Sequence, residues 1–184
     1  MTVVLGLDPG TRHFGWGIVR KNGTRLVHIA HGVLDVEDEG ELGDRLVAIE
    51  ASLVAIIEEH KPEHASIESL FFAKDASAAA KLGHARGVAL LVCTRAGLRA
   101  FEYAPARVKR TVAGHGRAEK TQVAQMIRVV LGLAEAPKSD AADALAVAVT
   151  HLQGMRLPVP KPSPLAQLAL NPGRKRRFRP YSNG

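Results

Sequence analysis

The feature that most constrains the fold is a series of three extended segments at the start of the chain. They cover residues 2–8, 13–20 and 24–36. Each is rich in apolar and β-branched side chains, as buried strands are. Pro9-Gly10 follows the first segment and Asn22-Gly23 separates the other two, and neither connection is long enough for a helix. An antiparallel meander of three strands is therefore predicted.

The rest of the chain up to residue 153 alternates between helical and extended patterns. Residues 41–60 carry apolar side chains at helical spacing with acids on the opposite face, and Pro62 closes this helix. Two more strands are predicted at 64–70 and 98–103, and further helices at 75–97, 104–114, 118–133 and 139–153. Ser139 is the expected N-cap of the last helix. The order βββαβαβααα predicts an α/β fold, a mixed five-stranded sheet flanked by helices.

The composition changes after Gln153. Residues 154–184 hold six of the ten prolines and seven Lys or Arg residues, and they contain no acid. Such a segment is unable to bury a hydrophobic core. Residues 1–153 are therefore predicted to form one folded domain, and residues 154–184 a basic, disordered tail.

The tail accounts for the whole net charge of +7, because residues 1–153 have as many acidic as basic side chains. Within the domain the charges are separated along the chain. Residues 35–63 hold ten acids, whereas residues 64–134 hold eleven Lys or Arg against four acids. One half of the domain could present a basic face to a nucleic acid. Charge alone leaves open the alternative that these are ordinary solvated side chains.

Membrane insertion and secretion find no support in the sequence. No apolar run approaches the roughly 18 residues that span a bilayer, and the N-terminus lacks the basic region and cleavage site of a signal peptide. Cys93 is the only cysteine and lies in an apolar run, so a buried structural thiol is expected rather than a reactive one. These features favour a cytoplasmic protein.

Four acids stand where packing alone would not place them. Asp8 ends an apolar strand directly before a Pro-Gly turn, and Glu68 lies near the end of the fourth predicted strand. Asp140 and Asp143 are three residues apart in an apolar helix, on one face of it. Asp140 has an alternative explanation, since an acid in the first turn complements the helix dipole. Asp143 lacks that explanation, and a carboxylate in an apolar helix is costly unless it is paired or binds metal.

Two carboxylates at strand ends and two on one helix suit a site for hard divalent cations such as Mg²⁺. In a two-metal site one ion activates water and the other stabilises the leaving oxygen of a displacement at phosphorus. The spacing alone leaves open that the four acids are unrelated surface residues. Zinc is disfavoured, because the chain has one cysteine and Pro62 separates His60 from His64.

Four stretches in order resemble one known family. They are GLDPGTRHFGWG, IESLFFAKDASAAAKLGHARGVA, FEYAPARVKRTVAGHGRAEKTQV and SDAADALAVAVTH. Their sequence and spacing are similar to those of RuvC, the crossover (Holliday) junction endodeoxyribonucleases, over roughly residues 3–153. The resemblance implies an RNase H-like fold with a catalytic, metal-binding quartet, matched here by Asp8, Glu68, Asp140 and Asp143. Some members of the family have histidine where Asp140 stands.

The resemblance also implies an activity and its partners. The expected enzyme is a homodimer that uses two Mg²⁺ ions per active site, with Mn²⁺ able to substitute. It makes paired symmetric nicks in four-way DNA junctions, leaving 5′-phosphate and 3′-hydroxyl ends, in recombination and repair. The expected protein partner is the RuvA–RuvB branch-migration complex.

Further residues are assigned from the resemblance. Phe71 matches an aromatic residue that wedges into the base pairs near the junction centre, while Phe72 is the expected core residue. Lys109 and Lys120 match basic residues near the scissile phosphate; without the resemblance they would be ordinary solvated lysines. Gly83 and Gly87 permit close helix approach at the expected dimer interface.

Three other functions remain to be weighed. The stretch GLDPGT resembles the phosphate loop of actin-like ATPases and sugar kinases, but those proteins need a second such domain and an adenosine site. A junction-binding scaffold without activity is disfavoured because all four acids are present. Another nuclease of the same fold, such as an RNase H, is disfavoured by the LGHARG and VKRT stretches.

Overall fold

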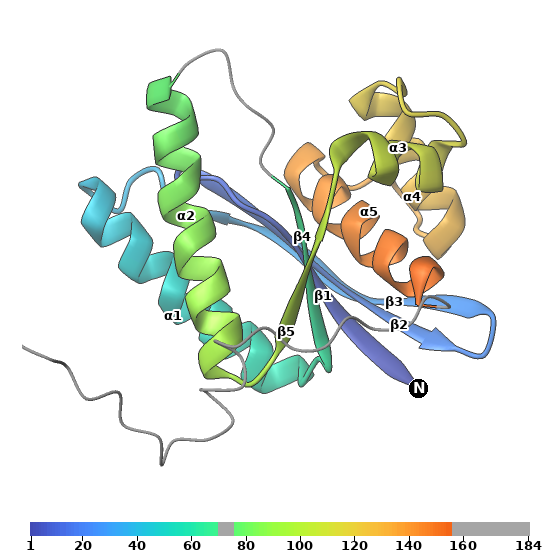
Figure 1. The fold of residues 1–184 in the computed structure, drawn as a ribbon, viewed down its shortest axis with the longest axis horizontal. Helices are drawn as coiled ribbons and strands as arrows, with labels where there is room; N and C mark the ends of the chain where they lie inside the picture. The colour runs from blue at the N-terminus through green and yellow to red at the C-terminus, as the bar shows by residue number, and fades with distance from the viewer. Residues whose placement is uncertain (70–75, 156–184) are drawn as a thin grey trace, which may run out of the picture.

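The computed structural model describes residues 1–69 and 76–155, whose elements follow the predicted order (Figure 1). The strands are β1 Thr2–Asp8, β2 His13–Asn22, β3 Arg25–Asp35, β4 His64–Glu68 and β5 Arg99–Tyr103. The helices are α1 Leu42–His60, α2 Ala76–Arg95, α3 Pro105–Ala113, α4 Lys120–Leu131 and α5 Ser139–Gly154. The roles predicted for Phe71 and Phe72 and for the tail beyond Met155 concern residues outside the described ranges.

The five strands form one mixed sheet in the order β3-β2-β1-β4-β5. β1, β2 and β3 are antiparallel neighbours, which confirms the predicted meander. β4 runs parallel to β1, and β5 runs parallel to β4. The chain reaches β4 through α1 and β5 through α2, as crossover connections to parallel strands require. The predicted mixed five-stranded sheet is confirmed.

Helices cover both faces of the sheet. In Figure 1, α1 and α2 lie on one side, and α3, α4 and α5 lie on the other. Leu5 and Leu7 of β1 belong to a core with Leu53 of α1, whereas Val4 belongs to a second core with Leu145 of α5. All five side chains are at most 1% exposed. Burial on both faces explains why β1 is a continuous apolar run rather than an alternating one.

Helix α5 lies unusually close to the sheet, and two glycines make this possible. A Cβ atom at Gly6 of β1 would lie 1.9 Å from the main-chain oxygen of Ala144. A Cβ atom at Gly15 of β2 would lie 2.0 Å from the main-chain oxygen of Asp140. Neither position can therefore hold a larger residue without displacing the helix that carries Asp140 and Asp143.

We expect Gly6→Ala to destabilise the fold by about 2–3 kcal/mol, because the added methyl group meets helix backbone that is not free to move aside. Urea unfolding followed by circular dichroism measures this loss. Gly43→Ala is the matched control: Gly43 lies in α1, and a Cβ there would meet no atom of the described residues within 4 Å. Ala at that position should stabilise the helix by about 0.5–1 kcal/mol. Equal stability of the two variants would contradict the proposed close approach.

Two local predictions are wrong by one residue. The hairpin loop consists of Gly23 and Thr24, since Asn22 still pairs with Arg25 across β2 and β3. Gly23 takes the positive φ of +61° that the tight loop needs. The N-cap of α5 is Lys138 rather than Ser139, which is the first helical residue, and no side chain caps this end.

The predicted buried thiol is confirmed. Cys93 is 1% exposed in the core between the sheet and α1 and α2, and burial raises its pKa to about 12. A thiol with so high a pKa is inert at neutral pH.

Over the described residues, we find no helix with the length and apolar character to cross a membrane.

Candidate active site

Asp8 and Glu68 lie side by side at one edge of the sheet. Asp8 is the last residue of β1 and Glu68 the last residue of β4. The two strands are parallel, and Leu7 pairs with Ile67 directly before the two acids. The parallel pairing of β1 and β4 therefore brings the two carboxylates together at the ends of these strands.

Helix α5 brings a third carboxylate to the same edge. Asp143 lines a cavity of about 230 Å³ together with Asp8 and Glu68. The other lining residues are Pro105, Val108, Lys109, Lys120 and Val123, from α3 and α4. Three of the four predicted acids and both predicted lysines thus meet in one cavity. Asp140 does not line it, although its charge contributes to the electrostatics of Asp8.

Burial and neighbouring negative charge raise the pKa values of Asp8 and Glu68. Burial, together with the negative charges of Asp143 and Glu68, raises the pKa of Asp8 from 3.8 to about 7. Burial and Asp143 also raise the pKa of Glu68. Desolvated acids of like charge are typical of functional sites, because packing alone would avoid them.

Lys120 partly compensates this negative charge. Its Nζ donates a hydrogen bond of 2.9 Å to Oδ2 of Asp143, and this bond raises the pKa of Lys120. The Lys120 side chain is 68% exposed, so it can leave the carboxylate at little cost. Lys120 and Lys109 also lower the pKa of Glu68.

The donor set suits a hard divalent cation. Carboxylate oxygens are the ligands that Mg²⁺ prefers, and a cation beside Asp8 and Glu68 would lower the raised pKa values of both groups. Among the described residues, no group of three Asp, Glu, His or Cys side chains is arranged closely enough to hold a metal ion. The Lys120 ammonium instead pairs with Asp143. Asp8, Glu68 and Asp143 are therefore the residues that could hold Mg²⁺.

We expect Asp8→Asn to stabilise the metal-free protein above pH 7. The pKa of Asp8 is higher in the folded protein than in the unfolded chain, so the folded state binds more protons between about pH 4 and pH 7. The contribution of Asp8 to stability is therefore present at acid pH and lost as the pH rises through about 7. Asn carries no charge, and its advantage at pH 8 should be about 2–3 kcal/mol.

Urea unfolding in EDTA at pH 8 and at pH 4.5 measures this effect. The advantage of Asp8→Asn should shrink at the lower pH, and Mg²⁺ should reduce it at pH 8 by stabilising the wild type. The control is Asp38→Asn, at an exposed acid. An Asp8→Asn variant less stable than the wild type at pH 8 would contradict the electrostatic explanation.

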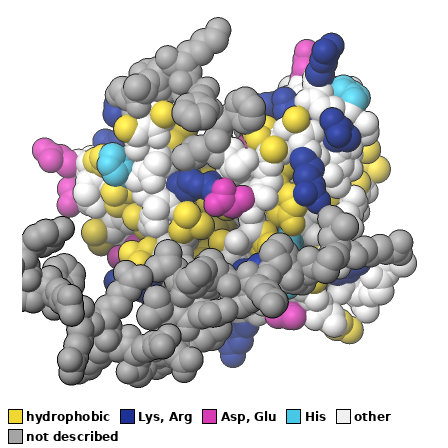
Figure 2. All heavy atoms as spheres, in the orientation of Figure 1, with side chains coloured by type: hydrophobic (Ala, Val, Ile, Leu, Met, Phe, Trp, Pro, Cys, Tyr) yellow, Lys and Arg dark blue, Asp and Glu magenta, His cyan; other side chains and the backbone are white. Residues whose placement is uncertain are grey.

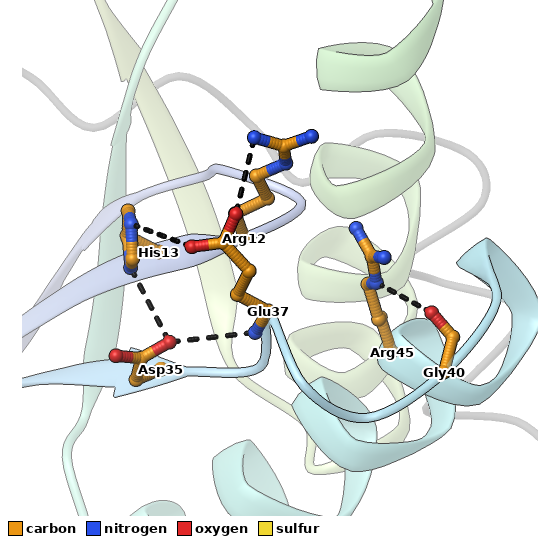
Figure 3. Close-up of polar contacts among 6 residues, drawn as sticks. All are labelled: Arg12, His13, Asp35, Glu37, Gly40 and Arg45. Atoms are coloured by element: carbon orange, nitrogen blue, oxygen red, sulfur yellow. Dashed lines mark hydrogen bonds and ion pairs between the residues drawn. The ribbon is translucent and has the colours of Figure 1, made fainter.

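A second polar cluster lies where β2 begins and β3 ends, outside the cavity lining. His13 opens β2 and pairs with Asp35 at the end of β3. Its ring lies between two acids, with Nδ1 3.5 Å from Asp35 Oδ1 and Nε2 3.8 Å from Glu37 Oε2 (Figure 3). Arg12 forms an ion pair of 3.1 Å with Glu37. No sequence pattern indicated this cluster, because its members pair only after the strands align.

Basic side chains surround the cavity. Exposed or half-exposed cations come from α3, the segment that follows it and the start of α4: Arg107, Lys109, Arg110, Arg117 and Lys120. Figure 2 shows dark-blue side chains over the upper right of the molecule, where Figure 1 places α3. This surface can contact phosphates on either side of a substrate bound at the cavity.

Gly83 and Gly87 lie on α2, away from the cavity. Among the described residues, a Cβ atom at either position would meet no atom within 4 Å, so packing against residues 1–69 and 76–155 does not require these glycines. Their predicted role at a dimer interface stays a prediction.

With this geometry established, comparison with known proteins identifies the family. The family model of crossover junction endodeoxyribonuclease RuvC matches residues 4–151. The chain belongs to this family. A crossover junction endodeoxyribonuclease RuvC from Sorangium cellulosum is 58% identical over 149 residues, which are 81% of this chain and 83% of that protein. One from Bradyrhizobium diazoefficiens is 46% identical over 80% of this chain and 85% of its own.

Solved structures agree with the RuvC assignment. The Thermus thermophilus RuvC in complex with a Holliday junction substrate has a TM-score of 0.78 at 37% identity, covering 83% of this chain and 93% of that one. A yeast mitochondrial Holliday junction resolvase has a TM-score of 0.56 at 15% identity, covering 80% of this chain and 77% of its own, which shows a shared fold alone. The predicted RNase H-like fold and the RuvC resemblance are confirmed, and the chain is a crossover junction endodeoxyribonuclease.

Proposed function

We propose that this protein resolves Holliday junctions by nicking two strands of the four-way junction, with Asp8, Glu68 and Asp143 as the metal-binding catalytic residues. One observation carries this proposal: three carboxylates and two lysines, contributed by separate strands and helices, line one cavity at the sheet edge. A RuvC chain needs these groups at one place to hydrolyse a phosphodiester bond. Asp140, outside the cavity lining, is the fourth acid and adds negative charge near Asp8.

The chemistry follows from the residues in the cavity. Bound Mg²⁺, two ions per site, supplies an activated water and charge stabilisation at the phosphate, and Mn²⁺ can replace it. Asp8 and Glu68 would hold the cation as carboxylates, and its positive charge would lower the raised pKa of both groups. Lys120 leaves Asp143 and contacts a phosphate oxygen. Lys109, on α3 in the cavity wall, contacts the same phosphate group.

The basic surface and Phe71 recognise the substrate. Phosphates lie along the basic surface of α3 and α4, and Phe71 stacks against unpaired bases at the branch point. Two copies joined through Gly83 and Gly87 of α2 give paired symmetric nicks with 5′-phosphate and 3′-hydroxyl ends. Such a dimer acts in the cytoplasm, in recombination and repair, on junctions that the RuvA–RuvB complex has moved.

Cleavage of synthetic substrates under single-turnover conditions tests this function. With Mg²⁺, a four-way junction should be cut at symmetric positions, and the nicks should be sealed by DNA ligase because the ends carry 5′-phosphate and 3′-hydroxyl groups. EDTA should stop the reaction. The matched competitor is an RNA–DNA hybrid of the same sequence. Faster cutting of the hybrid than of the junction would assign the protein to RNase H activity instead.

A further inference from the structure

Arg86 is a charged residue buried at the centre of helix α2. It is 7% exposed, and its neighbours Ala85 and Ala89 belong to the core beneath the helix. A guanidinium group this deeply buried is costly unless its donors are paired. Its partners therefore indicate why the chain places it there.

The guanidinium group joins three elements at the edge of the candidate active site. Nη1 donates a hydrogen bond of 2.5 Å to the main-chain oxygen of Glu68, at the end of β4. Nη2 lies 2.7 Å from Oε2 of Glu102 in β5. Because the guanidinium is planar and its donors are fixed in direction, these two contacts hold α2, β4 and β5 in one arrangement.

Glu68 needs such a contact because β4 ends there. Glu68 is the last residue of β4 to pair with β5, opposite Tyr103, and the N–H of Ser69 donates to the main-chain oxygen of Tyr103 at 2.8 Å. The peptide after Glu68 is therefore held by β5 through its N–H and by Arg86 through its carbonyl oxygen. The Glu68 side chain, on the same residue, lines the cavity.

We propose that Arg86 is a positioning residue: it fixes the main chain of Glu68 so that the carboxylate faces the cavity in the orientation that binds the cation. This inference rests on the proposed role of Glu68 as a metal ligand. Arg86 does not line the cavity and acts only through Glu68. Glu102 has a supporting role, since its half-exposed carboxylate orients the guanidinium.

Mn²⁺ binding to the full-length, DNA-free protein tests the proposal, with free Mn²⁺ counted by electron paramagnetic resonance. Removing a hydrogen bond that orients a metal ligand lowers metal affinity by about 10–100-fold. Arg86→Met, which keeps most of the side-chain volume, should lower Mn²⁺ affinity by about tenfold or more. In Arg86→Lys the ammonium can reach only one of the two acceptors. Its Mn²⁺ affinity should therefore lie between those of Arg86→Met and the wild type.

Three variants at two exposed positions, Glu102 and Arg95, complete the design. Glu102→Gln keeps an acceptor for Arg86 and should bind Mn²⁺ almost as the wild type does. Glu102→Ala should weaken binding only about threefold, because Arg86 still bonds to Glu68 in that variant. Arg95→Met is the control, because Arg95 lies on the same helix and pairs with Glu50, away from the cavity. It should leave Mn²⁺ affinity unchanged.

The outcomes separate this inference from the proposed function. A purely structural Arg86 would lower the folded fraction, measured by circular dichroism, without changing the Mn²⁺ affinity of the folded protein. Wild-type Mn²⁺ affinity in folded Arg86→Lys and Glu102→Ala, even where Arg86→Met fails to fold, would overturn the inference. A wild-type protein that binds Mn²⁺ but leaves junctions uncut would overturn the proposed function and leave the role of Arg86 standing.

Discussion

Replacing Asp8 with Asn should abolish junction cleavage while junction binding stays nearly unchanged. The substitution removes one of three cavity carboxylates but none of the basic residues around them. Loss of charge stabilisation in the transition state should lower the single-turnover rate by about 10³-fold or more. Glu68→Gln should have the same effect. Asp140→Asn should lower the single-turnover rate by a smaller factor, because Asp140 lies outside the cavity lining.

Gel-shift binding and single-turnover cleavage of the same labelled junction measure the two quantities side by side. Asp38→Asn, at an exposed acid, is the control for the loss of one negative charge. If Asp8→Asn or Glu68→Gln still cuts at close to the wild-type rate in Mg²⁺, the assignment of that residue is wrong. The stability gain expected for Asp8→Asn would show that the lost activity does not come from misfolding.

Lys120→Met should be the next most damaging substitution. Lys120 forms an ion pair with a cavity carboxylate, at 2.9 Å from Asp143, and it is exposed enough to reach a bound phosphate. Its loss should lower the cleavage rate at saturating protein by about 10²–10³-fold, as the loss of one stabilising donor does. Arg128→Met removes a positive charge from the same helix and is the matched control.

Both variants should weaken DNA binding slightly, because each loses a positive charge near the basic surface. Only Lys120→Met should slow the chemical step. Equal cleavage rates for the two variants at saturating protein would mean that Lys120 contributes to binding alone. Lys120→Arg tests the same point, since it keeps the charge but changes its geometry.

The sequence predicted the strand ends that carry Asp8 and Glu68, because the acids interrupt clear apolar patterns. The resemblance to RuvC added the expectation that Asp140 and Asp143 would join them. The periods of the hydrophobic residues indicate which side chains face the sheet, and the element order predicts a meander within a mixed sheet. The strand order β3-β2-β1-β4-β5 was not predicted, because the hydrophobic pattern of a strand does not say which strand lies beside it, and only the structure brings Asp8, Glu68 and Asp143 to one cavity.

Long-range contacts between polar groups could not be predicted in this way. Nothing in the local pattern indicates that Arg86 bonds to the main chain of Glu68, eighteen residues earlier. The bond between Lys120 and Asp143 likewise depends on the packing of α4 on α5. Gly6 and Gly15 looked like ordinary strand glycines, and their importance emerges only from the helix backbone that lies against them.

The most direct test of the active-site assignment is anomalous diffraction from crystals grown in Mn²⁺. We expect an anomalous peak in the cavity, within about 2–2.5 Å of carboxylate oxygens of Asp8, Glu68 and Asp143, with the Lys120 ammonium moved away from Asp143. A second peak about 4 Å from the first would be the two-ion arrangement. Saturating Mn²⁺ that gives no peak in the cavity, or peaks only at other acids, would contradict the assignment.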